Sequence, residues 1–205
     1  NILLLMKVGI FIFKGVEILD FTGPYEVLAS TRVTSKVLTK KNVNDIYKHP
    51  SPFKVFTITS KNKMIVTSGG LKVMSNYTFL DAPNFDILII PGGKGTRSLI
   101  SNKSITSWLY NKKNTKLIIS ICTGSLLLAA AGLLKNRKAT THWSAFELLK
   151  KLSPSTKVLK KRYVVDKIFT SAGVASGIDL SLKVVENFYG KNVAKNTAKY
   201  MEYNY

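Results

Sequence analysis

The chain has 205 residues, 45% of them hydrophobic, which excludes a disordered protein and predicts one domain over residues 1–205. One cysteine and two histidines exclude an internal disulfide framework and form no Cys/His cluster, so we expect no metal, no cofactor and a reducing compartment. Lys and Arg outnumber Asp and Glu by 31 to 11, a net charge of +20, but they are mostly dispersed lysines without interleaved aromatics, so we expect nonspecific polyanion affinity and no specific nucleic-acid binding.

The start of the chain is a short apolar run, Asn1 to Leu5, followed by Met6, a candidate native start. The run is too short for a secretory signal or a membrane span, and no small-residue cleavage site follows it. We therefore expect a cytoplasmic protein that does not engage a membrane.

Strands and helices are predicted to alternate along the chain. Apolar, β-branched runs predict strands at 7–13, 53–60, 86–90 and 117–121, a hairpin at 64–73, and short strands near 158, 163–166 and 168–170. Helical patterns cover 22–30, 104–112, 124–131, 142–151, 178–188 and 193–200, whereas the lysine-rich segment 33–51 is read as a loop. This order predicts a mostly parallel sheet between two helix layers, with the ligand crevice at the carboxyl ends of the strands.

Cys122 lies where one of these strands ends and a helix begins, in Ile121-Cys122-Thr123-Gly124-Ser125. A nucleophile on such a turn is held away from its own backbone, and the amides of the following helix favour the thiolate. The alternative is an inert core thiol, because free cysteine is among the most buried residue types.

Two glycines, Gly92 and Gly93, follow another predicted strand at the same sheet edge. Their spacing matches neither a dinucleotide-binding loop nor a phosphate-binding loop. The alternatives are a tight turn or an oxyanion site, in which the amides of Gly93 and Thr123 face charge that develops on a substrate held by Cys122.

Asp20 precedes a predicted helix, in Leu19-Asp20-Phe21-Thr22-Gly23-Pro24. It either caps that helix or places a carboxyl group beside the thiol, where a thiolate favours a protonated Asp20 and the two groups titrate as a pair. His142, in Thr141-His142-Trp143, either activates the thiol or is a satisfied histidine near a helix start.

These motifs together resemble the ThiJ/PfpI superfamily over nearly the whole chain, from Val8-Gly9-Ile10 to Met201-Glu202-Tyr203. The resemblance implies a flavodoxin-like three-layer sandwich, related to the class I glutaminases, in which the cysteine sits on a nucleophile elbow. It also implies a homodimer. Within the superfamily the chain is most similar to the isonitrile hydratase branch, because of its Leu-Asp-x-Thr-Gly-Pro segment.

That branch implies a lyase that adds water to an isonitrile and releases an N-substituted formamide. Carried over, Cys122 would be the nucleophile and Asp20 the general acid/base, while Thr123 would position the substrate or donate from its backbone. His142 matches a position that matters more in other branches. Thr123 stands where the protease-like branch has His, and no DNA-reading module is expected after Tyr205.

Three alternatives to a small-molecule hydratase stay open at the level of sequence. The same thiol suits a glyoxalase or deglycase-like hydrolase. It also suits a redox or stress sensor, in which Cys122 is reversibly oxidised. A ligand-binding domain that keeps the fold without the chemistry is the third.

Overall fold

A computed structural model describes residues 5–205 and contains a seven-stranded sheet with two helix layers. The apolar run at the start of the chain therefore falls outside the described residues, except for the exposed Leu5. The strands are β1 (Met6–Phe11), β2 (Phe53–Thr59), β3 (Met64–Val66), β4 (Lys72–Met74), β5 (Tyr77–Thr78), β6 (Ile87–Ile90), β7 (Leu117–Ile121), β8 (Lys138–Ala139), β9 (Lys157–Val158), β10 (Tyr163–Val164) and β11 (Ile168–Ser171).

The main sheet has the order β10-β11-β7-β6-β1-β2-β5, and only β10 runs antiparallel to its neighbour. After β1 the chain forms β2 and β5 on one side of it. It then crosses to the other side of β1 and forms β6, β7, β11 and β10. Ligands of open α/β sheets bind in the crevice at such a switch point. The predicted flavodoxin-like sheet is confirmed, as is the hairpin, which forms the antiparallel pair β3–β4.

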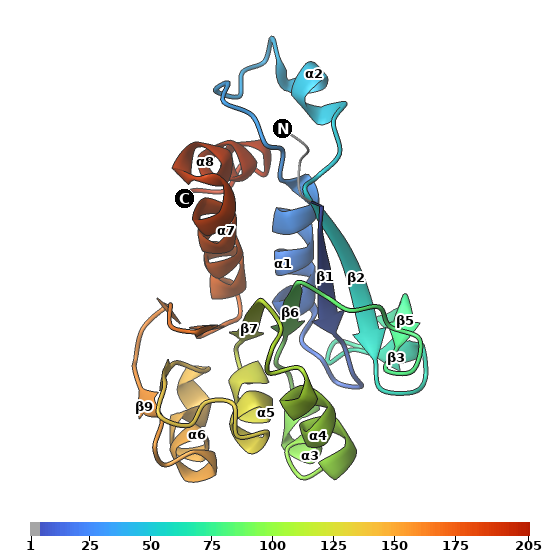
Figure 1. Cartoon of the computed structure of the whole chain (residues 1–205), viewed down its shortest axis with the longest axis vertical. Coiled ribbons are helices and arrows are strands. Elements are labelled where there is room, and N and C mark those ends of the chain that lie inside the picture. The colour runs from blue at the N-terminus through green and yellow to red at the C-terminus, as the bar shows by residue number, and fades with distance from the viewer. Residues whose placement is uncertain (1–4) are drawn as a thin grey trace.

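Helices cover both faces of the sheet (Figure 1). One layer contains α1 (Ile18–Ser30), α7 (Ser176–Tyr189) and α8 (Lys191–Tyr200), and the other contains α3 (Thr96–Leu99), α4 (Lys103–Asn111), α5 (Gly124–Ala130) and α6 (Phe146–Leu152). The short helices α2 (Val43–Tyr47) and η1 (Trp143–Ala145) complete the set. No helix in residues 5–205 is long and apolar enough to cross a membrane.

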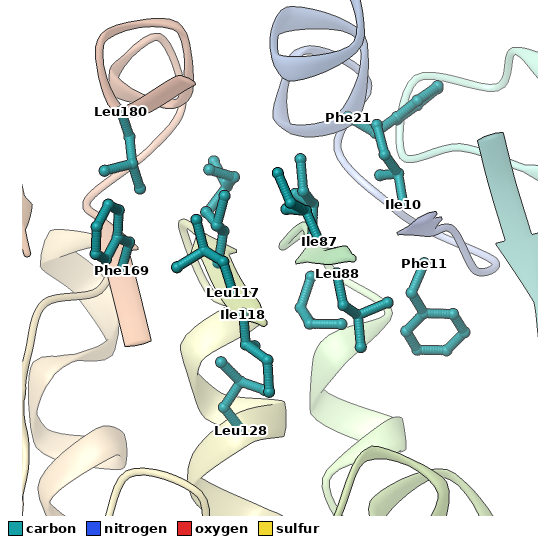
Figure 2. Packing of buried hydrophobic residues seen from close by; sticks show 14 of the residues in the cluster. Ile10, Phe11, Phe21, Ile87, Leu88, Leu117, Ile118, Leu128, Phe169 and Leu180 are labelled. Atoms are coloured by element: carbon teal, nitrogen blue, oxygen red, sulfur yellow. The ribbon is translucent and has the colours of Figure 1, made fainter. Parts of the chain in front are cut away.

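The core lies on both sides of the central strands, as expected for strands that are mostly apolar. Every residue of β6 and β7 is buried. Figure 2 shows Phe21 and Leu180 packed on the side of α1 and α7, and Leu128 on the side of α5. Burial on both faces explains why these strands show no alternation of polar and apolar residues.

Several elements differ from the sequence prediction: α3, β5 and β8 were not predicted, and the helix predicted at 142–151 is divided into η1 and α6. Helix α1 begins at Ile18, four residues before the predicted start at Thr22, so that Pro24 lies inside the helix and not in its first turn. Proline there removes one hydrogen bond to the carbonyl one turn earlier and crowds that carbonyl, which is why it was expected in the first turn. The segment predicted as a loop contains α2, whose single buried side chain, Ile46, gives little apolar periodicity to detect.

Three loops meet at the carboxyl edge of the sheet. The loop after β1 is joined to the loop after β6 by an isolated bridge between Val16 and Gly93. The turn after β7 carries Cys122, and β7 pairs directly with β6. The fold thus brings together the segments of Asp20, Gly92 and Cys122, which are far apart in sequence.

Candidate active site

Cys122 occupies the turn between β7 and α5 in a left-handed conformation, with φ of 54°. This conformation is strained for a residue with a side chain and is the mark of a nucleophile elbow. The Cys122 N–H donates to the Ser171 carbonyl at 2.9 Å, and its own carbonyl accepts from Thr141 Oγ1 at 3.1 Å and Ser125 Oγ at 3.2 Å. These three bonds hold the turn in place.

Asp20 lies in the first turn of α1 and is completely buried. Its Oδ2 atom accepts the Gly92 N–H at 3.0 Å, whereas no N–H or O–H group in residues 5–205 donates to Oδ1. The Cys122 thiol is a close neighbour of the carboxyl group, and each group shifts the pKa of the other. Asp20 is therefore not the helix cap, since that position belongs to Glu17, and its carboxyl group faces the thiol.

Burial shifts both members of this pair toward their neutral forms. It raises the pKa of Asp20 from 3.8 to about 7, although hydrogen bonds from Gly92 and the Cys122 thiol oppose the shift. Burial, followed by the charge of Asp20, raises the pKa of the Cys122 thiol to about 12. Hydrogen bonds from Thr123 favour the thiolate but are outweighed. The expected stabilisation of the thiolate by the start of the helix thus exists, yet burial outweighs it and the sulfur keeps its proton near neutral pH.

Thr123 follows the nucleophile, and its hydroxyl group lies at the centre of a small hydrogen-bond network. Thr123 Oγ1 accepts the Gly93 N–H at 3.0 Å and lies 3.2 Å from Thr96 Oγ1. The Gly93 amide, which we predicted to face substrate, is therefore occupied within the protein. Its role as an oxyanion donor stays a prediction, and so does the role of the Thr123 amide, which is directed to the Cys122 sulfur.

Two glycines allow the backbone to approach the pair closely. A Cβ atom on Gly92 would lie 2.6 Å from Thr123 Oγ1 and 2.9 Å from Asp20 Oδ2. A Cβ atom on Gly173 would lie 2.9 Å from Cys122 Sγ. Gly92 was selected from the sequence as part of a turn, whereas Gly173 was missed, because nothing in the sequence near it indicates that it contacts the thiol.

His142 lines the cleft, but one of its ring nitrogens is hydrogen-bonded within its own segment. Its Nδ1 atom lies 2.8 Å from Ser144 Oγ and accepts weakly from the Ser144 N–H at 3.4 Å, which caps η1. The structure places His142 at a helix start and in the same cleft as Cys122, and its role in activating the thiol stays a prediction.

The cleft above Cys122 has a volume of about 360 Å³. Among its lining residues are five that sequence reasoning did not select, namely Glu17, Lys94, Arg97, Ser144 and Val174. Lys94 directly follows the Gly92-Gly93 pair, and Glu17 lies about one helical turn before Asp20. Their proximity in sequence to predicted site residues could have identified both. Within residues 5–205, no three His, Cys, Asp or Glu side chains are grouped to hold a metal.

The family model described as the DJ-1/PfpI family matches residues 6–187. This chain belongs to the DJ-1/PfpI family. The isonitrile hydratase of Pseudomonas putida is 32% identical over 200 residues, which cover 97% of this chain and 78% of that protein. The family thus accounts for the elbow cysteine and for the flavodoxin-like sheet.

Two further DJ-1/PfpI comparisons place the chain within a varied family. The glutathione-independent glyoxalase DJR-1.2 of Caenorhabditis elegans is 31% identical over 169 residues, 82% of this chain and 85% of that protein. The crystal structure of a ThiJ/PfpI family protein from Pseudomonas syringae matches with a TM-score of 0.82 and 25% identity, over 98% of this chain and 76% of that one.

Proposed function

We propose that this protein is a cysteine-dependent hydratase that adds water to an isonitrile, with Cys122 as nucleophile and Asp20 as proton carrier. One observation carries the proposal: the completely buried Asp20 carboxyl group lies beside the thiol of Cys122, which is held in a strained turn, and each group shifts the pKa of the other. The similarity to an isonitrile hydratase across 97% of the chain supports the choice of substrate.

The first half of the reaction forms a thioester-like adduct of the isonitrile. Asp20, as carboxylate, takes the thiol proton while the sulfur bonds to the terminal carbon of R–N≡C. The same proton then passes from Asp20 to that carbon, giving a thioformimidate, Cys–S–CH=N–R. With a pKa of about 7, Asp20 both accepts and returns a proton near neutral pH.

The second half adds water and releases the product. Asp20 removes a proton from a water molecule while the water oxygen bonds to the thioformimidate carbon. Asp20 then passes that proton to the nitrogen. The C–S bond then breaks, the second water proton returns to the sulfur, and R–NH–CHO leaves. The sum is R–NC plus H₂O to the formamide, and the free thiol is regenerated.

The Thr123 amide is the proposed donor to charge that develops on the substrate. It now points to the Cys122 sulfur, the position from which a bound adduct would extend. Thr123 Oγ1 holds the Gly93 amide at 3.0 Å, so Gly92 and Gly93 position Asp20 and Thr123 and thereby shape the substrate site.

A glyoxalase is the second candidate, favoured by the 31% identity to a glutathione-independent glyoxalase over 82% of the chain. A screen of simple isonitriles and glyoxals, with Cys122→Ala as the blank, separates the two. Formamide production that is lost in Cys122→Ala supports the hydratase. Hydroxy acid production from glyoxals, with no isonitrile turnover, would assign the site to the second candidate.

A further inference from the structure

Two neighbouring surface clefts share Lys161 and are lined by residues of α6, β8, β9 and β10, the last of which is an edge strand of the main sheet. Their volumes are about 300 Å³ and about 400 Å³. We call them together the basic–aromatic groove, defined by Trp143, Phe146, Lys160, Lys161 and Arg162 in the first cleft and Lys138, Lys157, Lys161 and Tyr163 in the second.

Trp143 is the most informative residue of the groove, because 75% of its side chain is exposed. A large apolar ring left in water is an unfavourable use of a tryptophan unless something covers it. Phe146, also in the groove, has Lys160 Nζ at 6.0 Å from its ring centre. An aromatic surface thus lies directly beside a cation.

The positive charge of the groove is largely uncompensated. Among the described residues, neither Lys160 nor Lys161 forms an ion pair, and no acidic residue lines either cleft. Two groove residues have acidic partners, since Arg162 pairs with Asp179 and the Lys138 amide donates to Asp166 at 2.8 Å, whereas the nearby Glu147 binds Lys150 at 2.8 Å. Lys160 therefore acts on Glu147 only at longer range.

The fold supplies what the sequence lacked. The cluster Lys160-Lys161-Arg162 has no aromatic residue within it, which argued against a nucleic-acid site. In the folded chain, Trp143 and Phe146 line the same cleft as this cluster. Both residues lie at the start of the α6 segment, and α6 packs on β9. Cations beside exposed aromatic rings are the combination that single strands require, with phosphates on the cations and bases stacked on the rings.

We infer that the basic–aromatic groove binds single-stranded nucleic acid without sequence preference, with a base on Trp143 and phosphates on Lys160 and Lys161. A stacking ring accepts any base, so the expected binding is sequence-tolerant. A duplex hides its base faces, and inorganic polyphosphate has none, so both should bind the groove less well than a single strand of similar charge. The inference is independent of the reaction at Cys122.

The first test uses fluorescence of the full chain with oligothymidylate of about 12 nucleotides, a length within the range of known single-strand sites. Trp108, the other tryptophan, is stacked on Phe79 at 3.9 Å and is only partly exposed, so Trp143 should account for the quenching. Trp143→Phe should remove the quenching yet keep most of the affinity measured by anisotropy. Trp143→Ala should weaken binding roughly 5- to 150-fold, the range for one lost stack.

The second test separates the groove from net charge. The double variant Lys160→Ala/Lys161→Ala is matched by Lys40→Ala/Lys41→Ala, which removes the same charge from two exposed lysines before α2. If both groove lysines contact phosphates, the first variant should reduce the slope of log K against log salt by about 1.4, since each contact contributes about 0.7. The matched variant should leave that slope unchanged.

Three outcomes would overturn the inference. Equal weakening by the two double variants would mean that only the +20 net charge attracts the strand. Equal affinity for duplex, polyphosphate and single strand would remove the role of stacking. If Trp143→Ala changes the oligomeric state and leaves binding of the single strand unaffected, the exposed ring belongs to a contact between copies of the chain.

Discussion

The thiol of Cys122 neighbours the buried carboxyl group of Asp20, and their interaction acts in opposite directions on the two pKa values. The interaction lowers the pKa of Asp20, but burial outweighs it and the pKa is raised to about 7. The same interaction adds to the effect of burial on Cys122, whose pKa is raised to about 12. Because the two groups titrate as a pair, near neutral pH the first proton to leave is the one on Asp20. Asp20 is thereby suited to be the base and Cys122 the latent nucleophile.

We expect kcat/KM for an isonitrile to rise with pH through about 7 and then level off, because Asp20 must be ionised to accept the thiol proton. Asp20→Asn should lower kcat/KM roughly 100- to 10,000-fold and remove this rise. The measurement is a pH profile of formamide formation by both proteins. A profile that is the same in wild type and Asp20→Asn would return Asp20 to a structural role.

The same carboxyl group should make the protein less stable as the pH rises. Its folded pKa of about 7 exceeds the ordinary value of 3.8, so its contribution to stability is fully present below about pH 4 and is lost through about pH 7. A pKa raised from 3.8 to about 7 corresponds to about 4 kcal/mol of stability at most. Asn carries no charge to bury, so Asp20→Asn should gain stability relative to wild type over this window.

Urea unfolding of wild type and Asp20→Asn at about pH 5 and about pH 8 checks this expectation. The other titrating carboxyl groups are common to both proteins, so their effects cancel in the comparison. A difference in the free energy of unfolding that does not change with pH would show that the folded protein does not raise the pKa of Asp20.

How far the sequence predicts this site depends on how local each determinant is. The strand-to-helix turn at Cys122 could be predicted from the sequence, because a β-branched strand, a turn and a helix-forming segment follow one another directly. The partner of the Gly93 amide was not, because Thr123 lies thirty residues away and its hydroxyl group reaches the amide only in the folded chain. The pKa of Cys122 was misjudged for a related reason: the helix amides are local, whereas burial is set by the whole fold.

Gly92→Ala should disable the site more than it destabilises the fold. The new methyl group would lie 2.5 Å from the Thr123 backbone nitrogen, 2.6 Å from Thr123 Oγ1 and 2.9 Å from Asp20 Oδ2, so it must displace Thr123 and Asp20. Overpacking of this kind costs about 1–3 kcal/mol of unfolding free energy, and we expect at least a 100-fold loss of kcat/KM.

Gly69→Ala is the matched control, because its methyl group meets only the end of the Ile18 side chain at 3.1 Å. Activity and thermal unfolding of the two variants are measured together. Full activity of Gly92→Ala would mean that the substrate site tolerates movement of Asp20 and Thr123, contrary to the proposed mechanism.

Thr123→Val should leave the Gly93 N–H without its acceptor while keeping the shape of the side chain. A buried donor without a partner costs about 1–3 kcal/mol, and the loop after β6 should also lose its position relative to Cys122. Thr123→Ser keeps the hydroxyl group and should retain most of the stability and activity. Equal behaviour of the Val and Ser variants in unfolding and turnover assays would contradict this role.

Slow alkylation of Cys122 is the last expectation, and it separates the proposed hydratase from a redox sensor. A pKa of about 12 against an ordinary 9.0 reduces the thiolate near neutral pH by about a thousandfold. The greater nucleophilicity of a more basic thiolate recovers part of this, leaving labelling by iodoacetamide roughly 30-fold slower than in the unfolded chain. Asp20→Asn removes the negative neighbour and should label faster than wild type. Mass spectrometry over time gives both rates, and labelling of the folded wild type as fast as the unfolded chain would instead indicate the reactive thiolate that a sensor needs.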